Sequence, residues 1–511
     1  MGRRGRGDVR ATFRTVIGGN RRRLPAAGRT RRRWPVGVAA VALGVVIYAG
    51  ITQTRRASHA PRLPALPDLS AGPKAIGEHV RDADRRARMN PASAAAVEAL
   101  CLAYHADMFY DQAGECYAVA EGLSPRDLRW MYYRALAQSE RGASDALADG
   151  MRRVVAVAPD FGPAWWRLGE AEFKEGRYDR AEEAWRRAMA SPEPQRMPPA
   201  GSPPHVAAAE ISVYAALGLG RVALARGDAD DARQILESVI LRAPSFGPAF
   251  SVLADAYTAL DRVADAGRAG RTADRLPAHE PYADPMVDAL VRESRSSTFL
   301  LQQAAVADIN SNAAWREYLI RRALEFDPDN PDVVFELGTI LRRLGRHDEA
   351  LALLRRHQHM VPGDFQSLAE IGRCLAGLRR FAEAESFLRR ALQGIDDAVT
   401  HYDRGVVLTP LGRPAEAMAE YQHALDRNPH HVEARNNLAV GLIRQGELEQ
   451  AARELARVLE IDPEHADAHT NLGIVFASQG QPDRAAQEFQ EALRLNPEHT
   501  QAREGLRRIS R

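Results

Sequence analysis

The chain has 511 residues, and its composition of 45% apolar, 27% charged and 6% aromatic side chains excludes disorder throughout. The formal net charge is +2, but residues 1–34 hold twelve arginines and the single acid Asp8, which leaves −9 on the rest. A mildly acidic body argues against a nucleic-acid surface on the folded part, because phosphate binding needs a basic face.

The N-terminal region is typical of a membrane anchor. Residues 34–54 contain no charge, and as a helix they would span roughly 31 Å, about one bilayer core. Three arginines, Arg31 to Arg33, precede them, so the positive-inside bias places residues 1–33 in the cytoplasm as a disordered basic tail. The alternative is a buried helix of a soluble protein. Cleavage after Ser58-His59-Ala60 is disfavoured by Pro61.

These features predict a single-pass protein of the bacterial inner membrane, with its C-terminal part in the periplasm. Residues 55–74 contain four prolines, which favour an extended linker that lifts the folded part off the bilayer. Three cysteines are too few for a disulfide framework, but Cys101 and Cys116 could pair in an oxidising compartment.

A period of 34 residues runs through the rest of the chain. Gly473, Ala485, Phe489, Ala492 and Pro497 recur one period earlier as Ala439, Ala451, Leu455, Val458 and Pro463. This pattern resembles the tetratricopeptide repeat, and the resemblance implies two antiparallel helices per unit. The small residues are expected where the two helices cross closely, and the proline where the second helix ends.

Ten clear units and one degraded unit, at 297–330, predict an all-α superhelical solenoid of ten to eleven helix pairs after one transmembrane helix. Two proline-rich insertions, 192–204 and 276–285, interrupt the repeats. The expected organisation is a first repeat block at 75–280, a connecting segment at 281–296 and a second block at 297–511. Residues 500–511 resemble the polar capping helix that such stacks need.

The resemblance implies that the first helix of each unit lines a concave groove and that its positions 2, 5, 6, 9 and 12 or 13 meet ligands. Position 5 is aromatic in four units, where the side chains either anchor a partner or pack on a neighbouring helix: Tyr132, Trp166, Phe335 and Tyr402. Position 6 forms a polar row that either binds a peptide backbone or is simply solvated: Glu336, Glu370, Asp403, Asn437 and Asn471. With Asn436 beside it, this row resembles the asparagine ladder of O-linked N-acetylglucosamine transferases, without their catalytic domain.

No catalytic motif is present in the sequence. HExxH, GxSxG, P-loop and dinucleotide fingerprints do not occur, so we expect no enzyme activity, no cofactor and no small-molecule substrate. Histidines crowd the second half, but they lack the spacing of a metal site. We expect a membrane-anchored scaffold that binds proteins or peptides. The alternative is an assembly factor that presents substrates to a membrane enzyme or to a secretion or cytochrome-maturation machine.

Overall fold

The computed structural model describes residues 62–70, 72–142, 144–193, 210–276, 284–306 and 313–509. The predicted tail at 1–33 and the predicted span at 34–54 lie outside these residues. Within them, no helix combines the length and the apolar character that a membrane crossing requires.

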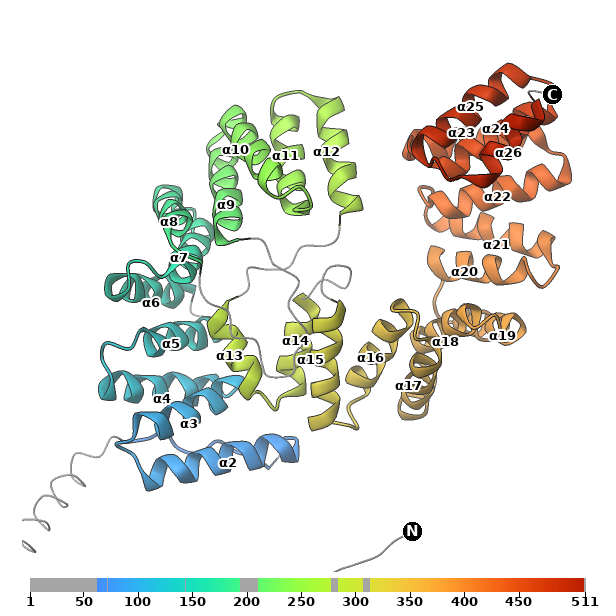
Figure 1. Cartoon of the computed structure of the whole chain (residues 1–511). Coiled ribbons are helices and arrows are strands. Elements are labelled where there is room, and N and C mark those ends of the chain that lie inside the picture. The colour runs from blue at the N-terminus through green and yellow to red at the C-terminus, as the bar shows by residue number, and fades with distance from the viewer. Residues whose placement is uncertain are drawn as a thin grey trace, which may run out of the picture. The chain divides into compact units, whose positions relative to one another are not determined.

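All 25 regular elements of the described residues are helices, which confirms the all-α repeat fold. The first twelve after the linker lie in order along the chain (Figure 1), and their bounds are α2 (Lys74–Met89), α3 (Ala94–Ala106), α4 (Tyr110–Leu123), α5 (Leu128–Glu140), α6 (Ser144–Val157), α7 (Gly162–Lys174), α8 (Tyr178–Ala190), α9 (Ile211–Arg226), α10 (Ala229–Arg242), α11 (Gly247–Ala259), α12 (Val263–Arg275) and α13 (Pro285–Glu293).

The remaining helices are α14 (Ser297–Val306), α15 (Ala313–Phe326), α16 (Pro331–Arg343), α17 (His347–Met360), α18 (Phe365–Gly377), α19 (Phe381–Ala391), α20 (Ala398–Leu408), α21 (Pro414–Arg427), α22 (Val432–Gln445), α23 (Leu448–Ile461), α24 (Ala466–Ser478), α25 (Pro482–Leu495) and α26 (Thr500–Ile509). Helix α26 ends the stack where the capping helix was expected, and Ile509 packs against the core there.

The helices pair as A and B partners, and several pairs cross where a glycine of one helix faces a large side chain of the other. At Gly473 of α24, an added Cβ would lie 2.7 Å from Phe489 of α25, and at Gly405 of α20 it would lie 2.5 Å from Tyr421 of α21. Only a residue without a side chain leaves room for the large one opposite. The 34-residue spacing of small residues therefore fixes where each pair touches.

The A helices lie on the closely spaced side of the stack. Most A helices pack on their own B helix and also on the A helix of a neighbouring pair, as α7 does with α9, α16 with α18 and α22 with α24. This is the inner side, and the B helices form the outer side.

Helix α13 interrupts the serial order of the repeats. It lies within the segment predicted as a connection, and it packs on α3 rather than on α12. Its Leu290 and Val291 belong to one apolar core that runs from Val80 to Val407. The two repeat blocks are therefore joined through the early helices, and the described chain after residue 60 is one compact unit.

The linker is extended, as expected, but it does not stand free. Pro64 is buried, Leu63 and Leu69 pack against the core, and Arg88 of α2 donates a hydrogen bond of 2.7 Å to the Pro64 carbonyl. Residues 62–70 are therefore part of the folded unit.

Cys101 of α3 and Cys116 of α4 form a disulfide, and both side chains are fully buried. The bond closes a loop with a sequence separation of 15 residues. A loop of this length stabilises the fold by about 3 kcal/mol through the restricted unfolded chain.

We expect Ala485→Leu to lower the stability of the last repeats by about 1–3 kcal/mol, because the fully buried Ala485 has no room for a larger side chain. Denaturant unfolding followed by circular dichroism measures the loss. The matched control is Ala419→Leu, since Ala419 is exposed on α21 and the change should be nearly neutral. Equal stability of the two variants would contradict the close helix crossing.

Candidate functional site

On the inner side of the early helices, the buried carboxylate of Asp284 is bound by a tyrosine and an arginine. Asp284, the residue before α13, accepts hydrogen bonds through Oδ2 from the Tyr132 hydroxyl at 2.5 Å and from Arg167 Nε at 2.7 Å. Its other oxygen, Oδ1, accepts from the Met286 amide at 2.9 Å and caps α13. Tyr132 is at position 5 of α5 and Arg167 is at position 6 of α7, where ligand contacts were expected. Asp284 of the same chain therefore occupies a place that was predicted for a ligand.

Burial controls the ionisation of this cluster. It raises the pKa of Tyr132 well above its usual value, and Asp284 adds to the effect, so the phenol stays protonated and donates. Burial alone would lower the pKa of Arg167, but Tyr132 and Asp284 outweigh it and the net pKa is raised. The phenol of Tyr132 is therefore neutral, and it lies beside the ion pair of Arg167 with Asp284.

The predicted aromatic anchors differ in exposure. Tyr132 is fully buried and is not open to a partner. Trp166 is half-buried and meets Tyr214 edge to face, and Phe335 is half-buried against His357. Tyr402 is also half-buried, and burial raises its pKa to about 12.

The acidic part of the predicted polar row is neutralised by arginines. Glu336 pairs with Arg316 at 3.0 Å, and Glu370 pairs with both Arg342 and Arg373. Arg373 also reaches Asp403, with 2.5 Å between Nε and Oδ2. Burial raises the pKa of Asp403, while Arg373 opposes the shift. The inner side from α15 to α20 therefore offers paired charges.

The asparagine part of the row follows on α22 and α24. Asn471 donates a hydrogen bond of 2.9 Å to Asn436, and both side chains are buried. Asn437 is half-buried and borders an open cavity. Whether this row binds a peptide backbone stays a prediction.

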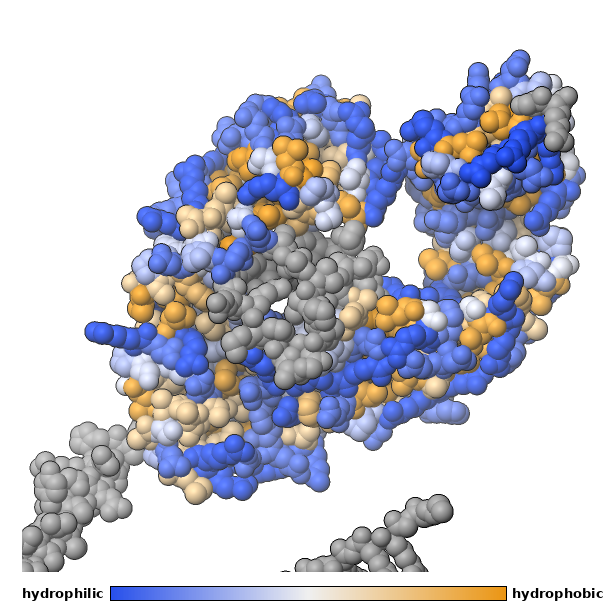
Figure 2. Space-filling model, in the orientation of Figure 1, coloured by the Kyte–Doolittle hydropathy of each residue, from blue (hydrophilic) through white to orange (hydrophobic). Residues whose placement is uncertain are grey.

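That cavity opens on the inner side of the second block. Its volume is about 680 Å³. The lining comes from A-helix positions 9, 12 and 13 of α20 and positions 6, 9 and 13 of α22, together with the start of α21: Val406, Thr409, Pro410, Pro414, Met418, Tyr421, Asn437, Val440 and Arg444. Figure 2 shows apolar side chains over α20 and α21, and further apolar patches elsewhere on the same face.

Arg444 sets the charge of this inner cavity. Its side chain is exposed, and no acidic group within ion-pair distance is found for it among the described residues. Sequence reasoning missed Val406, Thr409 and Arg444, although the rule that ligands meet positions 9, 12 and 13 of helix A pointed to them.

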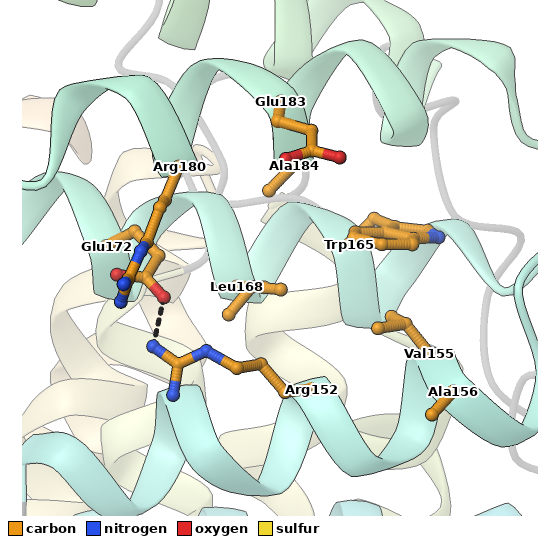
Figure 3. Close-up of a pocket in the computed structure, with 9 residues that line it drawn as sticks. All are labelled: Arg152, Val155, Ala156, Trp165, Leu168, Glu172, Arg180, Glu183 and Ala184. Atoms are coloured by element: carbon orange, nitrogen blue, oxygen red, sulfur yellow. Dashed lines mark hydrogen bonds and ion pairs between the residues drawn. The ribbon is translucent and has the colours of Figure 1, made fainter.

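A second cavity, of about 640 Å³, opens between α6, α7 and α8. Figure 3 shows Trp165 at one end and the ion pair of Arg152 with Glu172 at the other, with Leu168 between them. Glu172 also pairs with Arg177, and although burial opposes it, these two arginines lower the pKa of Glu172. The carboxylate at this end of the cavity is therefore already paired with arginines.

Histidines of the last repeats join the two helices of a pair. His401 contacts Glu420 and His469 contacts Glu488, each from position 4 of helix A, and Arg435 pairs with Glu454 in the unit between them. In the described residues, no three histidine, cysteine or carboxylate side chains are grouped so that they could hold a metal ion.

Models of the tetratricopeptide repeat match residues 145–194, 213–238, 311–365, 411–473 and 466–499. A small glutamine-rich tetratricopeptide repeat-containing protein 2 from Mycosarcoma maydis is 36% identical over 16% of this chain and 23% of its own length. Tetratricopeptide repeat protein 8 from Caenorhabditis elegans is 26% identical over 26% of this chain and 27% of its own. The match thus spans about a quarter of each relative.

Among solved structures, YrrB, a repeat protein with an unusual peptide-binding site, is 24% identical with a TM-score of 0.33, over 37% of this chain and 97% of its own. The APC/C hetero-tetramer Cut9-Hcn1 is 14% identical with a TM-score of 0.37, over 85% of this chain and 94% of its own. The family models show that the chain contains tetratricopeptide repeats, and the stacked helix pairs agree with them.

We expect the stability of the last repeats to depend on pH through His469. Its Nδ1 lies 2.7 Å from Glu488, and this contact raises the pKa of His469 above 6.5. The imidazolium therefore stabilises the fold fully below pH 6.5, and this contribution is lost as pH rises through the raised pKa. His469→Gln should cost about 1 kcal/mol at pH 5.5 and less at pH 8.5.

Denaturant unfolding at the two pH values measures the difference between the parent and His469→Gln. The exposed His359→Gln change is the control, and it should show no such dependence. A pH-independent difference for His469→Gln would contradict the stabilising imidazolium.

Proposed function

We propose that this protein is a scaffold, anchored in the bacterial inner membrane by residues 34–54, that captures protein partners through the inner cavity of α20 to α22. One observation carries the binding role. The cavity has apolar walls, it lies at A-helix positions of the inner side, and at its edge is Arg444, for which the described residues offer no acidic partner. The role is binding without catalysis.

The chemistry of the cavity favours an extended protein segment. Val406 is 38% exposed and Met418 is half-buried, so both offer apolar contact area to an incoming side chain. Asn437 offers an amide that both donates and accepts hydrogen bonds. Arg444 favours a segment that carries a carboxylate next to the apolar side chain. Buried apolar anchors and arginine are the groups that dominate interface energies.

Neighbouring parts of the inner side are less suited to capture. The acids from α16 to α20 are held by arginines, and breaking such pairs to bind a ligand would leave partly buried charges unpaired. The proposed capture site is therefore confined to α20 to α22.

The membrane anchor has two kinds of support. The sequence supplies an uncharged stretch of bilayer length behind three arginines. The disulfide between Cys101 and Cys116 supports an oxidising compartment for the repeats, since such bonds persist outside the cytoplasm. Both favour a periplasmic location of the folded part.

Arg444→Glu should weaken capture of partners by about tenfold or more, because it reverses the charge at the cavity edge. A photo-crosslinking residue at Val406 should label a partner in cells, and mass spectrometry would identify it. The matched control carries the same crosslinker at Ala419, which is exposed on the B helix α21. Identical adducts from both positions, unaffected by Arg444→Glu, would overturn the cavity as the capture site.

Reporter fusions to the C-terminus of the full chain test the anchor. Alkaline phosphatase should be active there and a cytoplasm-dependent fluorescent protein dark, because both would be exported. Deletion of residues 34–54 should reverse the two signals and release the protein from membranes. A fluorescent, phosphatase-inactive full chain would refute the periplasmic location.

A further inference from the structure

The segment Asp284–Ser297 is bound along the inner side of the first repeats by contacts of the kind that a peptide ligand makes. Figure 1 shows α13 beside α3 and α5, and α13 packs on α3. The segment meets Tyr132 and Tyr133 of α5, at positions 5 and 6, and Arg167 of α7, at position 6. These are inner-side positions at which a repeat of this kind would present side chains to a partner.

One end of the segment is held through a carboxylate. Asp284 is 3% exposed, and its Oδ2 receives Tyr132 and Arg167, with a further contact of 2.6 Å from Arg167. Arg167 and Tyr132 thus form a pocket that selects an acidic side chain. The same aspartate begins α13, with Pro285 at the first helical position, so the recognised chemistry is a carboxylate at a helix start.

The other end is held through its backbone. The Arg295 amide donates a hydrogen bond of 2.8 Å to Asp107, and the Ser294 hydroxyl donates one of 2.8 Å to the Ala106 carbonyl. Between the two ends, the Tyr133 hydroxyl donates to the Met286 carbonyl at 3.2 Å. The side chains of Asp107 and Tyr133 therefore bind backbone groups of the segment, and so does Arg322 of α15, while Ser294 of the segment binds the backbone of α3.

The middle of the segment supplies the apolar contact. Leu290 and Val291 are each 2% exposed and belong to the core that includes α3 and α5. Glu293, on the same helix, is exposed. The segment thus has an acidic residue at its start, an amphipathic helix in its middle and an end that is bound through its backbone. A helical peptide bound to the inner side would have the same features.

We propose that the inner side of α3 to α7 is a second peptide-binding surface with an aspartate pocket at Tyr132 and Arg167, and that residues 284–297 of the same chain are its resident ligand. The segment closes this surface to partners. Because ligand and surface belong to one chain, the effective concentration of the ligand is on the order of millimolar, so an outside peptide must compete with it. This proposal is independent of capture at α20 to α22.

A synthetic fluorescent peptide with the sequence of residues 284–297 tests the surface in the full-length protein. The parent should bind it weakly, because its own segment competes. Asp284→Ala in the protein should increase the affinity for the peptide on the order of tenfold, because the resident segment loses its carboxylate. The isosteric Asp284→Asn change should act in the same direction and keeps the size of the side chain.

Three controls sharpen the measurement, which is made by fluorescence anisotropy. Glu293→Ala in the protein should change the affinity far less than Asp284→Ala, since Glu293 is exposed and reaches only His79, at 4.0 Å. A peptide with alanine in place of its first aspartate should bind neither variant. Arg167→Ala added to Asp284→Ala should abolish the gain. Equal binding of the peptide to the parent and to both Asp284 variants would overturn the proposal.

Hydrogen exchange on the parent protein provides a test that does not depend on the folding of a variant. A resident ligand should open locally, so amides of α13 should exchange faster than those of α3 and α5. Exchange of all three helices at one common rate would make α13 an inseparable part of the core and would overturn the proposal. A concentration-dependent dimer that loses α13 contacts on dilution would also overturn it, because the ligand would then belong to a second copy.

Discussion

The close crossing of helix A and helix B within each pair is the constraint on which the rest of the structure depends. A glycine such as Gly405 or Gly473 lies against a ring of the partner helix, so neither backbone can move away without opening a void. Each pair is thereby a rigid unit, and the A helices of neighbouring pairs come together on the inner side. The positions 5, 6, 9 and 13 that face this side are fixed by the same crossing.

The inner side is not uniform, because charge pairing closes one part of it and leaves another open. Arginines hold the acids of α16 to α20, and an internal aspartate fills the pocket at Arg167. The repeats from α20 to α22 combine an open cavity with Arg444, for which no acidic partner is found in the described chain, and the cavity between α6, α7 and α8 has Arg180 in the same condition. The helix geometry is the same in each repeat. Selectivity for a partner would therefore depend on which charged side chains of the inner side are already paired within the chain.

Residues of the candidate site were predictable to the extent that they follow the repeat. The positions of Tyr402, Asn437 and Asn471 follow from counting along helix A, and Arg444 follows from the same rule. Their environment does not follow: the sequence left open whether Tyr132 anchors a partner or packs internally, and the structure buries it under Asp284, a residue 152 positions away. The Asp284-Pro285 pair was a readable helix start, but nothing in the sequence says which surface that helix covers.

The sequence by itself determined the helix pairs, their order and the places where they cross, because these depend on residues within one 34-residue repeat. It also indicated that Cys101 and Cys116 could pair in an oxidising compartment, and the structure contains that bond. Only the tertiary structure decided that α13 returns to α3 and that the acidic row is neutralised. The physical reason is distance along the chain: a carboxylate and an arginine 117 residues apart leave no periodic trace, and the folded core alone brings them together.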